Sequence, residues 1–257
     1  MKTLKEIEMT KPDECYLIMY ATKVKINIKK DDIISKEDLY IFIGLNSQGR
    51  RKYIGSYLDN PNNHRYWLDI FESIKSKGIK DIIFLATDDN TYLKKCAKVS
   101  YPNIATIPLL LEIMDEFYKY FSDKFSTKIR KEIKELYLGN DIEDYNNMYK
   151  LFVEKYGKNG ILASLISKYL KNVEETYKYD KNIRNAMFNN YMLKVLKNNI
   201  ISKNKNNTYY NSVEELLETQ VEYLNNIESF GSYTKREWLM ILESFYGVYK
   251  ERLEMYL

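Results

Sequence analysis

Apolar and polar residues alternate along the first third of the chain in the manner of a β-sheet. Residues Tyr16–Ile28 begin with an apolar run and continue with an apolar residue at every second position, which predicts one long strand. The polar stretches Lys29–Asp32 and Asn46–Gly49 have the composition of turns. Together these patterns predict a three-stranded antiparallel meander over Tyr16–Ile28, Leu39–Ile43 and Lys52–Tyr57.

The hydrophobic period then changes from two to between three and four. Apolar residues between Tyr66 and Ile74 recur at helical spacing, and Gly78 provides a helix stop. A short apolar run of buried-strand type follows, then a second helix and a further strand. The predicted elements are a strand at Asp81–Ala86, a helix at Tyr92–Val99 and a strand at Ile104–Ile107. The first 110 residues therefore have the predicted order βββαβαβ.

The rest of the chain has a helical pattern. We expect one long helix over Leu109–Phe125, a single helix over Lys181–Asn199 and a mobile polar loop at Ser202–Asn207. Further helices are predicted at Asp144–Tyr156, Ile161–Lys171, Val213–Ile227 and Lys235–Tyr256. The predicted organisation is an α/β core made of residues 1–110 and 181–257, with C-terminal helices, and an all-helical insertion over 111–180.

Composition excludes several classes of protein. Hydrophobic residues make up 45% of the 257 residues and charged residues 30%, which is typical of a globular chain and unlike a disordered one. The longest apolar stretch, Ile104–Leu111, is far shorter than the ~18–20 residues of a membrane span. The charged start, Met1–Glu14, lacks the apolar segment of a signal peptide. We therefore expect no membrane association and a cytoplasmic location.

Cysteine, histidine and net charge narrow the possible chemistry. Two distant cysteines, Cys15 and Cys96, do not form a disulfide framework, and we expect both to be small buried residues. The single histidine, His64, argues against Cys/His zinc sites and against Ser–His or Cys–His catalysis. The net charge of +4 permits contact with nucleic acid without requiring it.

Three stretches carry a resemblance to a known family. They are Leu39–Tyr57 (LYIFIGLNSQGRRKYIGSY), Trp67–Asp88 (WLDIFESIKSKGIKDIIFLATD) and the Tyr101-Pro-Asn103 turn. They resemble the second and third strands, the following helix and strand, and the turn before the fifth strand of prokaryotic Mutator-type transposases. The similarity continues more weakly to Leu217. It implies a ribonuclease-H-like fold with a mixed five-stranded sheet, an all-helical insertion and a last core helix.

The resemblance also implies a catalytic site and shows where this chain departs from it. In that family two aspartates and a glutamate hold two divalent metal ions, Mg²⁺ in active members, that activate water and the DNA 3′ hydroxyl. The corresponding positions here are Tyr20, Asp88 and Lys194, and Asp89 replaces the usual glycine. A neutral phenol and an ammonium cannot neutralise two metal ions. We therefore expect no metal cofactor and no transposition chemistry, with Asp88 as the weak remaining metal candidate.

Asp88 has two further interpretations. Asp88 and Asp89 end a strand, so they can cap the helix that begins near Thr91. Alternatively, Lys194 forms a salt bridge with Asp88 across the former metal site. A solvated Lys194 is equally compatible with the sequence.

Basic residues suggest a nucleic-acid interface. The candidates lie along the first strand, in the hairpin and next to the Asn-rich loop: Lys23, Lys25, Arg50, Arg51, Lys197 and Lys203. In a transposase catalytic domain such surfaces face DNA phosphates. A solvated charged face, interleaved with acidic residues, would give the same pattern. The family normally carries a helical DNA-binding region upstream, and only about fifteen residues precede the first strand here, so we expect recognition of transposon ends to be missing.

Three functions remain open from the sequence. The first is a catalytically inactive, transposase-derived protein that binds nucleic acid weakly and without sequence preference. The second is a protein-interaction module repurposed from a transposase, whose partner is another protein. The third is a metal-dependent nuclease with a rearranged carboxylate site made of Asp88, Asp89 and either Glu112 or Asp115.

Overall fold

The architecture comes from a computed structural model, which divides the chain into two compact units. It describes residues 2–8, 10–30, 32–60, 63, 65–120, 123–189, 191–206, 209–228 and 233–256, without the side chains of 30, 123–126, 172 and 203–206. The first unit contains residues 1–109, 190–235 and 251–257, and the second contains 110–189 and 236–250.

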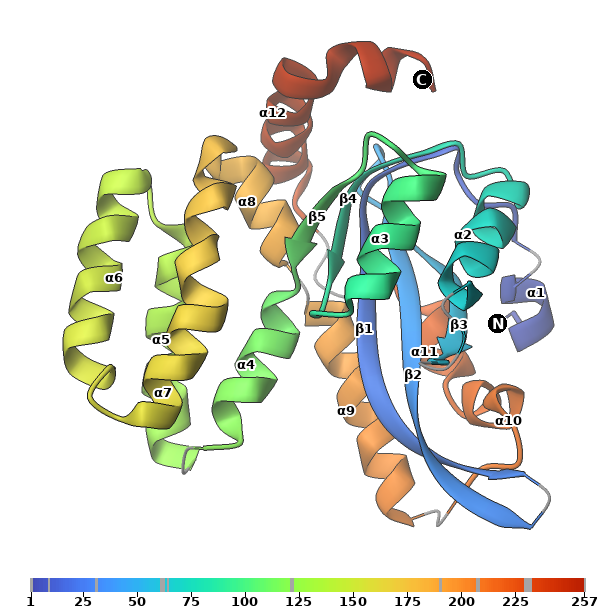
Figure 1. Cartoon of the computed structure of the whole chain (residues 1–257). Coiled ribbons are helices and arrows are strands. Elements are labelled where there is room, and N and C mark those ends of the chain that lie inside the picture. The colour runs from blue at the N-terminus through green and yellow to red at the C-terminus, as the bar shows by residue number, and fades with distance from the viewer. Residues whose placement is uncertain are drawn as a thin grey trace. The chain divides into compact units, whose positions relative to one another are not determined.

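The first unit is built around a mixed five-stranded sheet (Figure 1). The strands are β1 (Cys15–Lys30), β2 (Ile33–Leu45), β3 (Arg51–Leu58), β4 (Asp81–Thr87) and β5 (Ala105–Pro108). Their order across the sheet is β3-β2-β1-β4-β5; β1, β2 and β3 are antiparallel, whereas β4 and β5 run parallel to β1. This order confirms the α/β class and the ribonuclease-H-like arrangement that the sequence predicts.

The β1–β2 hairpin is longer than the hydrophobic pattern predicts. The second strand begins at Ile33, not at Leu39, because β1 and β2 stay paired without interruption from Ile18↔Leu45 to Lys30↔Ile33. The added segment, Ile33–Asp38, is mostly polar and contains no buried residue, so only the backbone ladder with β1 makes it a strand. Hydrophobic periodicity cannot report a strand of that kind.

Helices α2 (Tyr66–Ser76) and α3 (Thr91–Ser100) cover one face of the sheet (Figure 1). Their apolar residues join those of the sheet in one buried cluster, which includes Met19, Phe42 and Phe71. Helix α2 ends before Gly78, whose φ of 108° is accessible to glycine and unfavourable for other residues. The predicted helix stop is therefore confirmed.

Helix α9 (Tyr191–Asn206) packs against β1 on the other face of the sheet (Figure 1). The single helix expected over Lys181–Asn199 is wrong: α8 (Lys181–Phe188) ends at Asn189, whose backbone is not helical, and α9 begins two residues later. Asparagine favours such breaks because its amide competes for backbone hydrogen bonds. Helix α9 also continues through most of the segment that we expected to be a mobile loop.

Short helices complete the first unit. They are α1 (Leu4–Glu8), α10 (Val213–Glu218) and α11 (Val221–Asn225). A single helix over Val213–Ile227 is therefore also wrong, since the chain turns at Thr219 and the buried Gln220. The end of α12 (Lys235–Glu254) is tied to the sheet, because the Arg252 guanidinium donates to both carboxylate oxygens of Asp81, at 2.6 and 2.9 Å.

Every secondary-structure element described in the second unit is a helix. It contains α4 (Leu110–Tyr118), α5 (Asp123–Leu138), α6 (Ile142–Tyr156), α7 (Gly160–Leu165), a π-helical turn (Ile166–Leu170), a 3₁₀ helix (Lys171–Lys178), α8 and most of α12. The long helix expected over Leu109–Phe125 is two helices, since α4 ends at Tyr118. The unit also takes in α8 and residues 236–250 of α12. None of the described helices combines the length and apolar character of a membrane span.

Candidate functional site

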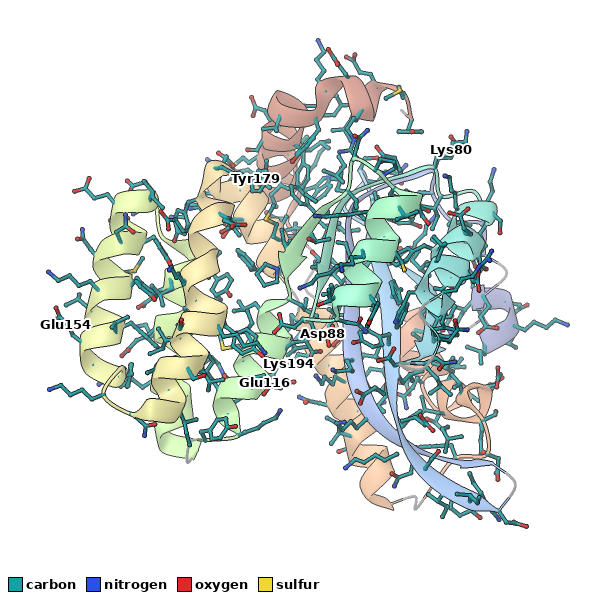
Figure 2. All side chains as sticks on the ribbon, viewed as in Figure 1. Lys80, Asp88, Glu116, Glu154, Tyr179 and Lys194 are labelled. Atoms are coloured by element: carbon teal, nitrogen blue, oxygen red, sulfur yellow. The ribbon has the colours of Figure 1, made fainter. Side chains whose placement is uncertain are left out.

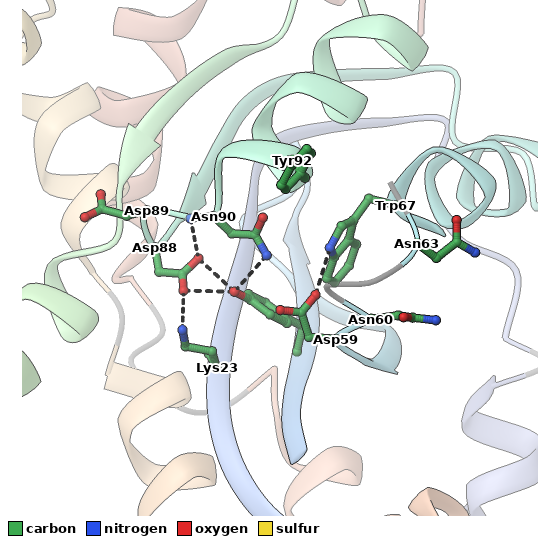
Figure 3. A pocket seen from close by; sticks show the side chains of 10 residues that line it. Lys23, Asp59, Asn60, Asn63, Trp67, Asp88, Asp89, Asn90 and Tyr92 are labelled. Carbon is green, nitrogen blue, oxygen red and sulfur yellow. Dashed lines mark hydrogen bonds and ion pairs between the residues drawn. The ribbon is translucent and has the colours of Figure 1, made fainter. Parts of the chain in front are cut away.

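Asp88 sits directly after β4, at the edge where β4 meets β1. Its carboxylate forms an ion pair with the Lys23 ammonium at 2.9 Å and accepts hydrogen bonds from the Tyr40 hydroxyl at 2.9 and 3.1 Å (Figure 3). Lys23 and Tyr40 are paired residues of β1 and β2, so the sheet register presents both side chains to Asp88. The backbone N–H of Asn90 is a further donor, at 3.2 Å. The carboxylate is therefore held by the protein's own donors.

A second carboxylate shares the positive charge of Lys23. Asp38 lies 3.7 Å from the Lys23 ammonium and 3.1 Å from that of Lys25. Two lysines of β1 thus alternate with Asp38 and Asp88 in one small network. Each lysine that the sequence analysis assigned to phosphate contact on this strand already has an acidic partner.

Burial and the charge of Asp88 set the protonation of Tyr40. Burial, followed by the negative charge of Asp88, raises the pKa of the Tyr40 phenol well above its ordinary value of 10. Tyr40 therefore stays protonated and donates to Asp88 at all physiological pH values. The Asn90 amide in turn donates to the Tyr40 oxygen at 3.2 Å.

The helix cap is Asn90 and not the acidic pair. The Asn90 side chain accepts from the backbone N–H of Leu93 at 3.0 Å, which is the N-cap interaction of α3. Asp89 is exposed and lies 3.8 Å from the Lys94 ammonium. The cap predicted for Asp88 and Asp89 is therefore wrong by one residue, because the chain turns once more before α3 begins.

A pocket opens beside this network on the α2–α3 face of the sheet (Figure 3). Its volume is about 340 Å³. The Asp59 carboxylate accepts from the Trp67 indole N–H at 3.0 Å within it. The lining residues are Lys23, Tyr40, Asp59, Asn60, Asn63, Trp67, Asp88, Asp89, Asn90 and Tyr92.

Tyr20 points to the opposite face of the sheet from Lys23. It pairs with Ile43 and lies three residues before Lys23 on a strand whose pairing is regular, so the two side chains alternate. Tyr20 is fully buried, and burial raises the pKa of its phenol well above 10. Its electrostatic neighbours are Tyr233 and Arg51, not Asp88. The two positions lie on neighbouring strands, since Tyr20 pairs with Ala86, but the Tyr20 side chain is on the face opposite Lys23, which holds Asp88.

Lys194 lies on α9 and is half-buried (Figure 2). Helix α9 contacts β1, as the resemblance implies for the last core helix. Among the described residues, however, the structure contains no hydrogen bond or ion pair between Lys194 and Asp88. The position opposite Asp88 that we assigned to Lys194 is taken by Lys23.

The residues at the implied metal site do not fit a pair of divalent ions. Tyr20 is neutral and faces away, Lys194 is a cation, and the Asp88 carboxylate already binds Lys23. Within the described residues, no three Asp, Glu, His or Cys side chains are grouped so as to hold a metal. Asp89 is directed away from Asp88, and the other two carboxylates proposed for a rearranged site, Glu112 and Asp115, belong to α4 in the second unit.

Arg51 is a clear correction to the predicted nucleic-acid interface. It is fully buried, so its guanidinium cannot reach a phosphate, and it lies 5.2 Å from the centre of the Tyr233 ring. Its neighbour Arg50 is exposed. The sequence places Arg51 in a turn, but the turn ends one residue earlier and Arg51 is the first residue of β3, facing inward.

The remaining candidates do not form one continuous surface. The side chain of Lys25 is 63% exposed, but Lys25 pairs with Asp38, whereas Arg51 pairs with Leu45. Seven residues of β2, or about 23 Å, separate these two levels of the sheet. Lys197 is half-buried on α9, whereas the Lys203 side chain and His64 lie outside the described residues. The sheet lysines and the hairpin arginines are thus separate surfaces.

Sequence reasoning missed most residues of the pocket. Tyr40, Trp67 and Asn90 belong to three different elements, and each fits a strand, a helix or a cap without any further role. The usable signal was Asp88 at a strand end together with Lys23 on a strand expected beside it. Only the register shows that Tyr40 completes the group.

Comparisons with known proteins place the chain in a family. The family model described as "Transposase, Mutator family" matches residues 2–229. The transposase for insertion sequence element ISRM3 of Rhizobium meliloti (strain 1021) is 15% identical over 240 residues, which cover 93% of this chain and 60% of the relative. The transposase for IS1201 of Lactobacillus helveticus is 20% identical over 192 residues, 73% of this chain and 51% of the relative.

A shorter match is the transposase for IS256 in transposon Tn4001 of Staphylococcus aureus, 19% identical over 127 residues, or 49% of this chain and 33% of the relative. The chain therefore spans at most 60% of the length of these three relatives. The match of the family model over residues 2–229 nevertheless covers most of the sequence. The chain belongs to the Mutator family of transposases.

Proposed function

We propose that this chain is a transposase-derived protein without metal-dependent strand-transfer activity that retains weak nucleic-acid binding without sequence preference. The observation that carries the loss of activity is the ion pair of Asp88 with Lys23, at 2.9 Å, in place of a metal ion. Two-metal catalysis needs several carboxylate oxygens around the ions. Tyr20 and Lys194 cannot supply them, and Lys23 adds a positive charge where a cation would bind.

The basic character of α9 supports retained nucleic-acid binding. Between Asp180 and Glu214 the chain has no acidic residue and carries six basic ones: Lys181, Arg184, Lys194, Lys197, Lys203 and Lys205. Four of them belong to α9, which packs against β1. Because the net charge of the whole chain is only +4, this helix is a local concentration of positive charge. We therefore expect α9 to make the main contacts with nucleic-acid phosphates, and Lys23, Lys25 and Arg51 to contribute less to binding.

Fluorescence anisotropy with labelled duplexes of two unrelated sequences tests this proposal. We expect both duplexes to bind equally at low salt, with an affinity that falls as salt rises by a log–log slope of about −0.9 per phosphate contact. Lys197→Ala should weaken binding to both and make the slope shallower by about 0.9. Lys98→Ala, at an exposed lysine of α3, is the matched control and should leave the slope unchanged. Mg²⁺ should cause no nicking of either duplex.

A protein-interaction module is the second candidate. The pairing of Lys23 and Lys25 with acidic residues and the burial of Arg51 favour it, because these contacts remove three of the six basic positions expected to face DNA. Absence of binding to duplex and single strands at low salt would decide for this candidate. Metal-dependent nicking that Asp88→Asn abolishes would overturn the loss of activity.

A further inference from the structure

We propose that the pocket beside Asp88 binds an unpaired nucleobase, with the phosphates of the strand remaining outside. Where the ligand is a nucleic-acid strand, this inference rests on the nucleic-acid binding proposed above. It specifies the part of the nucleic acid that the pocket recognises. The pocket lies on the α2–α3 face of the sheet, whereas the basic helix α9 packs on the other face, so the two proposals can fail separately.

The size and aromatic walls of the pocket suit a flat ring. Its volume of about 340 Å³ falls at the lower end of small-molecule sites, which range from roughly 300 to 1,000 Å³. Tyr92, in the first turn of α3, is 48% exposed at the pocket, and the buried Trp67 and Tyr40 form another part of its wall. Trp67 and Tyr40 are in edge-to-face contact, with ring centres 5.0 Å apart, so this wall is rigid. An exposed tyrosine in a pocket with a rigid aromatic wall provides a surface on which a base can stack.

The polar groups of the pocket match the edge of a base. Asp59 uses one carboxylate oxygen for the Trp67 N–H at 3.0 Å, and its second oxygen can accept from an exocyclic amino group. The Asn63 side-chain oxygen accepts from the backbone N–H of Arg65, so the NH₂ group is the part of this amide left to donate. The Asn60 amide adds both a donor and an acceptor at the same wall. Carboxylate and amide groups of this kind are the side chains that read base edges.

The charge of the pocket decides which part of a nucleotide it takes. Lys23 contributes +1 and Asp59, Asp88 and Asp89 contribute −3, which gives a net charge of −2. Because Lys23 is already bound to Asp88 and Asp38, it is not a phosphate ligand. A phosphate inside the pocket would be repelled, whereas a base with amino groups would be favoured.

The test compares an oligodeoxyadenylate strand with an abasic strand of equal length, which keeps the phosphates and lacks the bases. Anisotropy should show the abasic strand binding roughly tenfold more weakly, as expected for the loss of one base–aromatic stack. Tyr92→Ala should lower the affinity for the adenylate strand to that for the abasic strand. Tyr120→Ala, at a tyrosine that is 51% exposed in the second unit, is the matched control and should keep the difference. The duplexes used above should be unaffected by Tyr92→Ala.

Free nucleosides give an arm that needs no strand binding. Saturation-transfer NMR should detect adenosine and cytidine more strongly than thymidine, and Tyr92→Ala should abolish the signals. Equal binding of adenylate and abasic strands, with no nucleoside signal, would overturn the pocket proposal and leave the α9 proposal intact. Nucleoside signals without any strand binding would support the pocket proposal and overturn the α9 proposal. Binding of an oligoarginine peptide that Asp59→Asn weakens, in place of nucleosides, would assign the pocket to a basic protein segment and overturn the inference.

Discussion

The two faces of the sheet accommodate buried charge in different ways. On the α2–α3 face, Lys23 is partly exposed and is bound by two carboxylates, Asp38 and Asp88. On the other face, Arg51 is fully buried, and none of its side-chain nitrogens has a hydrogen-bond partner among the described residues. Its neighbours there are the phenols of Tyr20 and Tyr233. A charged group near water can be neutralised by mobile side chains of opposite charge. A charged group in the interior is surrounded only by the side chains that the packing places there.

The same contrast bears on the metal site that the resemblance implies. The resemblance puts a carboxylate at position 20, close enough to Arg51 for the two residues to interact electrostatically. A phenol at that position leaves the arginine without an anion, whereas Asp88 keeps a cation through Lys23. The four predictions below test this contrast, from the largest expected effect to the smallest.

Replacing Tyr20 with aspartate should have the largest effect. Tyr20→Asp removes a fully buried aromatic ring and should lower the free energy of unfolding by about 3–5 kcal/mol in urea denaturation. Because Arg51 can pair with the new carboxylate, the same change in an Arg51→Met background should cost more. Tyr20→Phe, which keeps the ring, should cost only about 1 kcal/mol. A smaller loss for Tyr20→Asp in the Arg51→Met background would contradict the proximity of the two residues.

The two buried arginines should respond in opposite directions. Arg184, in the second unit, donates to the carbonyl oxygens of Tyr179, Gly139 and Asn140, and its guanidinium lies 4.0 Å from the centre of the Tyr177 ring. Arg184→Met should lower the free energy of unfolding by about 2–3 kcal/mol, because buried acceptors lose their donors. Arg51→Met should leave it unchanged or raise it by about 1–3 kcal/mol, since an uncompensated buried charge is removed. Strong destabilisation by Arg51→Met would show that Arg51 has a bonding partner.

Breaking the ion pair on the more exposed face should have a modest effect. Asp88→Asn keeps an acceptor for the Tyr40 hydroxyl and removes the negative charge. We expect the free energy of unfolding to fall by about 1 kcal/mol. The effect is small because the Lys23 side chain is 32% exposed, so solvent screens the ion pair. Millimolar Mg²⁺ or Mn²⁺ should not raise the melting temperature of the wild type or of the variant, since a ligand stabilises a fold only by binding it. A metal-dependent rise in the wild type that Asp88→Asn abolishes would restore Asp88 as a metal ligand.

Alkaline pH should destabilise both faces through their buried phenols. The pKa values of Tyr20 and Tyr40 are raised above their ordinary value of 10, so both stay protonated in the folded state when they would ionise in the unfolded state. Below pH 10 both phenols make their full contribution to the free energy of unfolding. This contribution is lost as the pH rises above 10, by up to about 1.4 kcal/mol per pH unit for each residue. Tyr20→Phe and Tyr40→Phe should each make this decline shallower in urea titrations above pH 10. An unchanged slope in either variant would contradict the burial of that phenol.

The sequence by itself determined the sheet and the family. Alternation in Tyr16–Ile28 and the helical period in Tyr66–Ile74 gave the strand and helix order, because hydrophobic periodicity reflects which face of an element is buried. The motifs in Leu39–Tyr57 and Trp67–Asp88 resemble those of the Mutator family, and the family model confirms this membership. Asp88 was identified through this resemblance, which places the family's second aspartate at the end of the fourth strand. Helix breaks such as Asn189 were missed, because asparagine also occurs within helices.

Only the tertiary structure decided which side chains meet. The partner of Asp88 is Lys23, on β1, and not Lys194, because strand register and the alternation of side chains direct Lys23 toward Asp88 and Tyr20 away from it. Arg51 is buried for a similar reason: a turn that is one residue shorter makes it the first inward residue of β3. A shift of one residue in a strand exchanges its two faces. Composition and local pattern do not contain that information, so the sequence supplied the elements and the register determined the site.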